Sequence, residues 1–200
     1  MMPQESEASP NVLELFTDDL RLVAASRNLL EADLDGPLGK GVEAAGSQLA
    51  TLLGAEVPAQ WPPELFEQDD LERSLALSDQ PGSLGWNLWY LITRVPPDAD
   101  EARSARIVGI AGFGGAPDAD GVVMLGYSVV PEERRKGYAA QATDRLTAFA
   151  FEDPRTQCVA AETFEALTPS IGVLLKCGFA REGDAATPGA IRFVRHKPPG

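Results

Sequence analysis

The sequence predicts a single-domain α/β protein, and two observations in its second half support this fold class. Three strand-like segments follow one another at residues 86–94, 107–115 and 122–130, and charged or Pro/Gly turns separate them. A helical segment at 138–151 and a further strand at 157–164 come next. With 200 residues and 44% hydrophobic content, the chain is long enough to bury one full core.

The first half predicts a short hairpin followed by helices. Residues 1–11 read as a polar tail that we expect to be mobile. Residues 12–25 alternate in polarity around a turn at Thr17-Asp18-Asp19, which indicates a strand or hairpin. A rigid proline-rich segment, 57–63, interrupts the helical region. Helical spacing is present in three segments: 26–34, 42–53 and 64–77.

The C-terminal region predicts one more helix and the last strands. Thr168 is expected to cap this helix, with Pro169 at its first position and Gly178 just past its end. Residues 179–181 and 190–195 then complete the sheet.

The charge and the apolar pattern of the sequence together exclude nucleic-acid-binding and membrane-spanning proteins. The formal net charge is −13, from 17 Lys and Arg against 30 Asp and Glu, so general attraction to nucleic acid is excluded. No apolar stretch approaches the roughly 18 residues of a membrane span. The N-terminus also lacks a basic region followed by an apolar one, so we expect a cytoplasmic protein.

The two cysteines and the histidine do not predict a metal site. Cys158 and Cys177 form no C-x-x-C motif, and His196 is the sole histidine. A structural zinc site normally needs four such ligands, so no metal is expected. We interpret both cysteines as small buried side chains. A covalent mechanism in which a cysteine carries the acyl group stays open as the alternative.

A basic turn stands out in this acidic chain. Arg134, Arg135 and Lys136 precede Gly137, between an apolar strand and a helix start. Unpaired N–H groups and the helix dipole attract anions at such a start, and glycine lets the backbone approach phosphate closely. A solvated charge run is the alternative, yet cations at a helix start are unfavourable unless an anion is present. The turn matches neither a Walker loop nor a dinucleotide fingerprint.

Residues 134–139, R-R-K-G-Y-A, match the [Q/R]-x-x-G-x-[G/A] pattern of the GNAT superfamily of acyl-CoA-dependent N-acyltransferases, which this chain resembles. The resemblance extends to L-G-Y-S-V-V-P at 125–131 and T-P-S-I-G-V-L-L-K-C-G-F at 168–179. Leu20-Arg21-Leu22, residues 106–113 and Ala161-Glu162-Thr163 make it similar to the branch that includes RimJ and RimL.

The resemblance implies a mostly antiparallel sheet that splays between two parallel strands, with helices on both faces. The predicted order of strands and helices is compatible with this sheet. The gap between the strands at 122–130 and 157–164 would hold the thioester of acetyl-CoA. We expect one domain over 12–197, with an acceptor side at about 26–80 and a cofactor half at about 107–179.

The same resemblance assigns the cofactor contacts. The backbone N–H of Val129 would stabilise the oxyanion, and the pantetheine arm would pair along the strand that contains it. The N–H groups from Arg135 to Ala140 would meet the phosphates. The residues expected to bind the cofactor are Tyr127, Ser128, Val129, Arg134, Arg135, Lys136, Gly137, Tyr138, Ala139, Ala140 and Ser170.

Glu162 is the candidate general base. It lies in an otherwise apolar strand and faces the gap if Cys158 and Ala160 share its side. A strand-end carboxylate that meets solvent or an arginine is an equal alternative. In many members of the family an asparagine precedes the last helix, and a tyrosine within it protonates the departing sulfur. Leu167 and Leu174 stand at these two positions here. Ser170 would touch the cofactor or relay a proton through water.

The acceptor is predicted to be an amine, either a small molecule or a protein N-terminus. Trp61 is the preferred candidate for a wall of the acceptor site, with Trp86 as a second. Trp86 and Trp89 are expected on opposite faces of one strand, so that at least one is in the core. Transfer of a longer acyl group and a non-catalytic acyl-CoA-binding module remain alternatives, as do a monomer and a homodimer.

Overall fold

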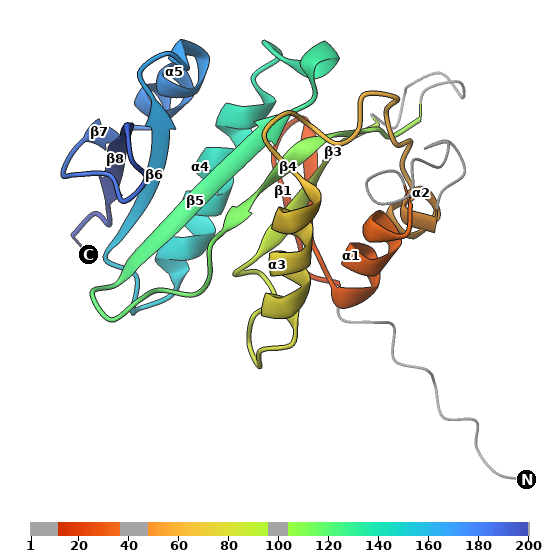
Figure 1. Ribbon diagram of the computed structural model, residues 1–200, viewed down its shortest axis with the longest axis horizontal. Coiled ribbons are helices and arrows are strands. Elements are labelled where there is room, and N and C mark those ends of the chain that lie inside the picture. Colours follow the sequence, from red (N-terminus) through yellow and green to blue (C-terminus); the bar gives the residue numbers. More distant parts are fainter. Residues whose placement is uncertain (1–11, 37–47, 96–103, 200) are drawn as a thin grey trace, which may run out of the picture.

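An eight-stranded sheet forms the centre of the part of the protein that the structure describes, and helices cover both of its faces (Figure 1). The computed structural model describes residues 12–36, 48–95 and 104–199. The predicted mobile tail, 1–11, lies outside these residues. The mixed sheet and its helices confirm the predicted fold class.

The strands follow the order β1-β2-β3-β4-β5-β6-β8-β7 across the sheet. Neighbouring strands are antiparallel except for β5 and β6, which are parallel. The predicted hairpin is confirmed as β1 and β2. The strands are β1 (Glu14–Phe16), β2 (Leu20–Ala24), β3 (Leu88–Thr93), β4 (Ile107–Phe113), β5 (Val122–Val129), β6 (Cys158–Phe164), β7 (Ala180–Arg181) and β8 (Ala190–His196).

The described helices lie close to the predicted segments. They are α1 (Arg27–Leu34), α2 (Gln48–Leu53), α3 (Gln68–Ser78), α4 (Tyr138–Glu152) and α5 (Thr168–Lys176), with a 3₁₀ turn at Pro131–Glu133. The first part of the predicted helix at 42–53 lies outside the described residues. No helix in the described ranges is long and apolar enough to cross a membrane.

Two helix starts differ from the prediction. The helix predicted from 64 begins at Gln68, because Leu65 has a left-handed φ of +64° and a Glu67–Asp70 capping box fixes the later start. Thr168 was wrongly predicted as a cap. Leu167 occupies the N-cap position without a side-chain hydrogen bond, and Thr168 is the first helical residue.

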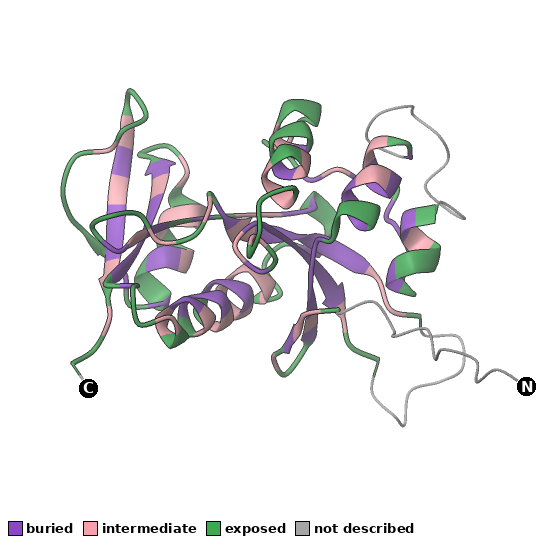
Figure 2. Cartoon of the chain, turned by 90° about the horizontal axis from the view of Figure 1, so that it is seen from below, coloured by how far each residue is buried: buried purple, intermediate pink, exposed green. Residues whose placement is uncertain are grey.

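The sheet separates two cores because successive strand side chains point to opposite faces. Trp89 and Leu91 of β3 join the core under α4 and α5, whereas Leu88, Tyr90 and Ile92 join the core under α1, α2 and α3. Figure 2 shows the buried strand residues between these helical layers. Each face of the sheet is therefore supported independently.

A buried carboxylate lies in the second core. Asp33 of α1 is fully buried and accepts hydrogen bonds from Trp61 Nε1 and the Tyr90 hydroxyl, both at 2.9 Å. Burial raises its pKa to about 6, although the two hydrogen bonds act in the opposite direction. Trp61 is only 7% exposed, and its ring centroid lies 6.1 Å from that of Tyr90. The structure thus gives Trp61 a position in the core.

Candidate functional site

The parallel strands β5 and β6 separate after a short paired stretch. They pair only where Val122, Val123 and Met124 meet Cys158, Val159 and Ala160. Beyond these pairs β5 stays on β4 and β6 stays on β8. Figure 1 shows the two strands diverging toward the ends that lead into α4 and α5. The predicted gap is therefore present in the sheet.

Backbone groups of β5 point into this gap. Val130 donates its N–H to the Val108 carbonyl at 3.0 Å, and Gly114 donates to the Met124 carbonyl at 2.9 Å. Even-numbered β5 residues therefore bond to β4, and alternation turns the N–H groups of Tyr127 and Val129 toward β6. Because β6 has already diverged, these two N–H groups have no strand partner there.

The basic turn leads directly into α4. Arg135 has a left-handed φ of +64° and Gly137 one of +88°, and the helix begins at Tyr138. No side chain caps this helix, and its first turn contains no acidic residue. The first intrahelical bond is that of Gln141 N–H to Gly137, so the N–H groups of 138–140 stay free of intrahelical partners. This end of α4 can bind an anion.

The three basic side chains of the turn have different environments. Arg134 Nε donates to the Val129 carbonyl at 3.0 Å, and its Nη2 pairs with Glu64 at 2.7 Å. Lys136 Nζ lies 2.7 Å from Glu133, and this hydrogen bond raises the pKa of Lys136. Arg135 makes no ion pair within the described residues, so its guanidinium is the one left for an added anion.

Tyr127 connects β5 to α5. Its hydroxyl donates to the Ser170 carbonyl at 3.0 Å and lies 3.1 Å from Ser170 Oγ. Burial raises the pKa of Tyr127 to about 12, so the phenol stays neutral near physiological pH. The contact holds the start of α5 and its serine hydroxyl next to β5.

Glu162 lies on β6 beyond the paired stretch, on the sheet face that it shares with Cys158 by alternation. Its Oε1 accepts the Ala186 N–H at 2.7 Å, and its Oε2 accepts the Thr187 N–H at 3.0 Å. Hydrogen bonds from Thr187 and Ala186 lower the pKa of Glu162. The carboxylate therefore holds the β7–β8 connection in place and is a weaker base than an unpaired glutamate.

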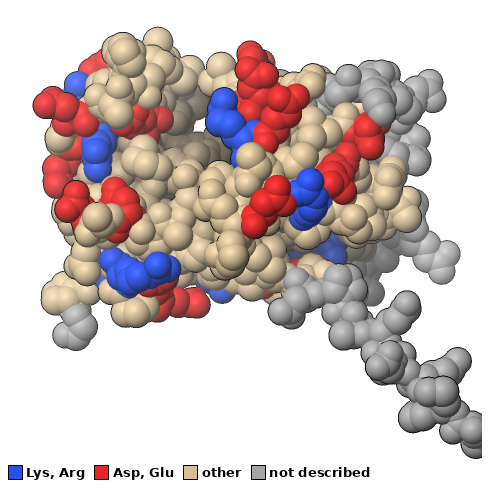
Figure 3. Space-filling view, turned by 60° about the horizontal axis from the view of Figure 1, so that its bottom comes forward, with Lys and Arg blue, Asp and Glu red and all other residues tan. Residues whose placement is uncertain are grey.

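A groove of about 510 Å³ runs between α3 and strands β4 and β5 on the same face. It contains polar side chains from α3 and the Gly112 and Gly126 backbones of the strands. A Cβ at Gly126 would meet no atom within 4 Å, so this glycine leaves the groove open. In the face shown in Figure 3, basic and acidic side chains are interspersed, and no extended basic surface is visible.

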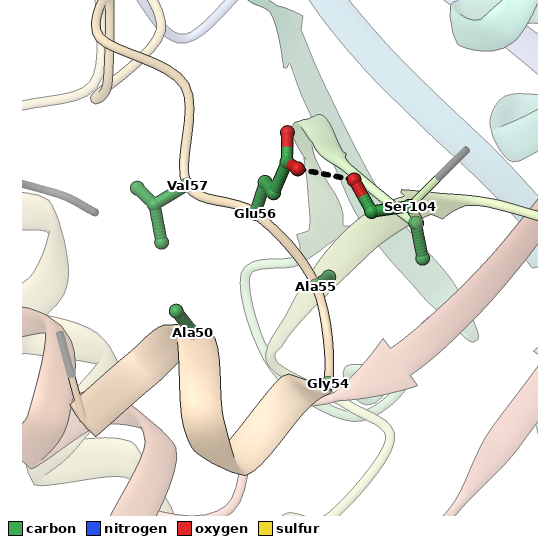
Figure 4. A pocket seen from close by; sticks show the side chains of 7 residues that line it. Ala50, Gly54, Ala55, Glu56, Val57 and Ser104 are labelled. Carbon is green, nitrogen blue, oxygen red and sulfur yellow. Dashed lines mark hydrogen bonds between the residues drawn. The ribbon is translucent and has the colours of Figure 1, made fainter. Parts of the chain in front are cut away.

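A second pocket, of about 430 Å³, lies next to α2 (Figure 4). Its carboxylate, Glu56, already accepts a hydrogen bond from Ser104. The remaining lining side chains, among them Ala50, Ala55 and Val57, are small and apolar. The pocket shares no lining residue with the β5–β6 gap or with the basic turn.

Trp86 and Trp89 pack in or against the core on the α4 side of the sheet. Trp86 is in a bend before β3, and its ring packs against Phe113 at 5.4 Å and Phe149 at 5.5 Å between centroids. Trp89 is fully buried and also contacts Phe149, at 5.5 Å. The prediction that Trp86 and Trp89 occupy opposite faces is wrong, because both rings reach the α4 side. The prediction that one of them is in the core is confirmed.

The fold brings most of the predicted cofactor residues together around one gap. Tyr127, Ser128 and Val129 line its β5 side, and the basic turn follows them in the chain. Ser170 lies next to this side because its hydroxyl contacts that of Tyr127. Glu64 was not predicted as a site residue, although its carbonyl accepts a 2.7 Å bond from Ser128 Oγ. No spacing or motif marked it, because it follows two prolines and lies outside every motif that carries the family resemblance.

Known proteins resemble this chain in both sequence and fold. The family model described as an acetyltransferase (GNAT) domain matches residues 48–180. The chain is 26% identical over 147 residues to YjdG of Bacillus subtilis (strain 168), described as an uncharacterized N-acetyltransferase, and the match covers 73% of this chain and 82% of that protein.

Two solved structures illustrate the shared fold. RimL, a ribosomal L7/L12 alpha-N-protein acetyltransferase, aligns with a TM-score of 0.58 at 14% identity, over 98% of this chain and 99% of its own. The Microcin C7 self immunity acetyltransferase MccE, in complex with acetyl-CoA and AMP, aligns with a TM-score of 0.56 at 14% identity, over 90% and 94%. Since the family model spans more than half of the sequence and the fold agrees, the chain belongs to the GNAT acetyltransferase family and is an acyltransferase.

Proposed function

We propose that this protein transfers an acetyl group from acetyl-CoA to a primary amine by direct attack in a ternary complex. The observation that carries the proposal is the open edge of β5, where the N–H groups of Tyr127 and Val129 face a gap without strand partners. The free N–H groups at the start of α4 follow directly in the chain. The acetyl-CoA complex of MccE, which has a similar fold, supports this cofactor.

The backbone supplies most of the cofactor binding in this proposal. N–H groups at 135–140 bind the pyrophosphate, and Arg135 adds a positive side chain. The β5 backbone at 127–129 pairs with the pantetheine arm. The Val129 N–H donates to the thioester oxygen as negative charge develops on it, which needs no side-chain rearrangement.

Proton transfer involves two further side chains. Acceptor amines have pKa values of about 8 or higher and are largely protonated at neutral pH, so a carboxylate must accept a proton directly or through water. Glu162 is the proposed base, because its Ala186 and Thr187 bonds leave further lone pairs free. Ser170 contacts the cofactor or relays a proton, and Tyr127 positions it.

No acid side chain occupies the position that the family uses on α5. Leu174 is 1% exposed and is part of the core. A thiol with a pKa of about 8.5 leaves tolerably well as a thiolate, so the reaction proceeds without that acid. A general acid typically contributes a factor of about 10² to 10⁴, and we expect slower turnover for this reason. The same observation favours the second candidate, an acyl-CoA-binding module without turnover.

Thiol release from acetyl-CoA, measured across a panel of amines and short peptides, separates the two candidates. Saturable release that falls at least about a hundredfold in Glu162→Gln supports the transferase, since this is the lower range of acid–base assistance. The matched control is Glu165→Gln, because Glu165 follows the same strand and pairs with the exposed Arg181. CoA binding with no turnover on any acceptor supports the binding module.

The acceptor class is part of this proposal. The similar fold of RimL, described as acting on the α-amino group of a ribosomal protein, supports a protein N-terminus. The open groove beside α3 is compatible with a peptide end or with a small amine. The net charge of −13 favours the approach of a cationic acceptor.

A further inference from the structure

Glu64 lies at the C-terminal end of β5, next to the proposed thioester position. Its carbonyl accepts the Ser128 hydroxyl at 2.7 Å, and its Oε2 pairs with Arg134 Nη2 at 2.7 Å. Arg134 Nε donates to the Val129 carbonyl at 3.0 Å. One guanidinium group therefore separates the Glu64 carboxylate from the residue whose N–H faces the gap.

The Glu64–Arg134 pair is accessible to a ligand. The side chains are 64% and 42% exposed, and an exposed ion pair adds little to stability. The second carboxylate oxygen, Oε1, has no hydrogen-bond partner among the described residues. The pair thus fixes the direction of the carboxylate while leaving one acceptor oxygen free.

The neighbouring residue points to a role in binding. Leu65 has a φ of +64°, which is unfavourable for a residue with a branched side chain, and it is 82% exposed. Leu65 and Phe66 line the groove between α3 and the sheet. Ser128, which donates to the Glu64 carbonyl, lines the same groove, so the Glu64 carboxylate lies beside residues of the groove.

We propose that Glu64, held by Arg134, binds the amino group of the acceptor. This inference rests on the proposed transferase function. Oε1 accepts an N–H bond from the acceptor, and Leu65 contacts the adjoining carbon chain. Arg134 then acts as a positioning residue for Glu64, while the pyrophosphate is left to the backbone N–H groups and Arg135. The arrangement selects amines over alcohols, because only a protonated amine gives the carboxylate a charged donor.

The test compares wild-type protein with Glu64→Gln, Arg134→Gln and the double variant. Glu64→Gln is expected to raise the acceptor KM about tenfold or more, as the loss of a charged hydrogen bond predicts. The CoA dissociation constant is expected to stay within about twofold. Arg134→Gln should raise KM similarly, and the double variant should add little, because both changes disrupt one unit.

Asp144→Asn is the matched control. Asp144 is 65% exposed and pairs with Arg195 at 2.7 Å, in a position away from the groove. Its removal is expected to leave both constants unchanged. An acceptor KM within twofold of wild type in Glu64→Gln overturns the inference, as does an equal loss of CoA affinity.

A second readout keeps the inference testable if the proposed function fails. Absence of thiol release by wild-type protein with every amine would reject the transferase proposal alone. The CoA complexes are then titrated by calorimetry with the peptide Ser-Ala-Ala and with putrescine. Binding to wild type and Asp144→Asn but not to Glu64→Gln supports the Glu64 site. Equal binding, or none, in all three proteins overturns it.

Discussion

The β5–β6 gap, together with the start of α4, and the α3 side of the sheet differ in the groups that they offer to ligands. In the gap and at the start of α4, the free groups are backbone N–H donors, and those of Tyr127 and Val129 point within the sheet toward β6. On the α3 side, the groups are the carboxylates of Glu64 and Glu162, which are held by hydrogen bonds from elsewhere in the chain and keep acceptor capacity. One side is therefore suited to phosphates and a thioester, and the other to an amine.

This difference shows how the two half-sites are specified. Backbone donors depend on chain direction and on a glycine in the turn, so many side chains are acceptable around them. Carboxylate positions depend on distant partners, because Arg134 and Glu64 are 70 residues apart in sequence. Three changes test the comparison, in order of expected effect.

Gly137→Asp is expected to weaken CoA binding about a hundredfold. The new carboxylate would oppose the phosphates at the N–H groups of α4, a loss of roughly 3 kcal/mol of charged hydrogen bonding. The φ of +88° also strains any replacement, by about 1 kcal/mol. Gly82→Asp is the control, since Gly82 has a φ of +77° and open space around it. Titration calorimetry and urea unfolding separate the two effects, and unchanged CoA affinity would make the turn an ordinary charged loop.

Asp33→Asn is expected to change how stability depends on pH. The folded-state pKa of about 6 lies above the ordinary value of 3.8, so the folded protein binds this proton more tightly. The contribution of Asp33 is present below about pH 4 and is lost as pH rises through 6, a change on the order of 3 kcal/mol. Asparagine keeps a partner for both Trp61 and Tyr90 without a buried charge.

Urea unfolding of wild type and Asp33→Asn between pH 4.5 and 7.5 measures this dependence. The variant should gain free energy of unfolding relative to wild type as pH rises. Asp144→Asn, at an exposed carboxylate, provides the baseline for other titrating groups. Parallel curves for wild type and Asp33→Asn would mean that burial does not raise the pKa of Asp33.

Arg135→Gln is expected to have the smallest effect. Arg135 is the one basic side chain of the turn without an ion pair in the described part of the chain, so its loss should weaken CoA binding by roughly two- to fivefold. The difference should shrink at high salt because the charge is exposed. Arg134→Gln should weaken CoA binding less. A larger loss in Arg134→Gln would show that Arg134 leaves Glu64 for the phosphates.

The sequence predicted the sheet and the turn that precedes α4 well, because both follow from local signals. Apolar runs marked β3, β4, β5 and β6, and Gly137 marked the start of α4. The sequence did not predict contacts between residues that lie far apart in the chain. Asp33 reads as an ordinary polar residue of α1, yet Trp61 and Tyr90, 28 and 57 residues away, enclose it.

Local predictions also failed where the tertiary structure changes an expected boundary. Glu64 was expected to begin a helix, but the left-handed backbone at Leu65 delays α3 and leaves Glu64 in a turn beside β5. Trp86 was expected on a strand, but it lies in the preceding bend and packs toward α4. The positions of both residues differ from the predicted ones because packing across the sheet decides which way their side chains face.

The sequence by itself determined the family, the order of strands and helices and the turn that offers backbone N–H groups, because each depends on near neighbours in the chain. Only the tertiary structure decided which carboxylates stand beside the gap. Glu162 is engaged by the β7–β8 connection, and Glu64 is held at the end of β5. Such positions require contacts between segments far apart in sequence, and no local pattern encodes them.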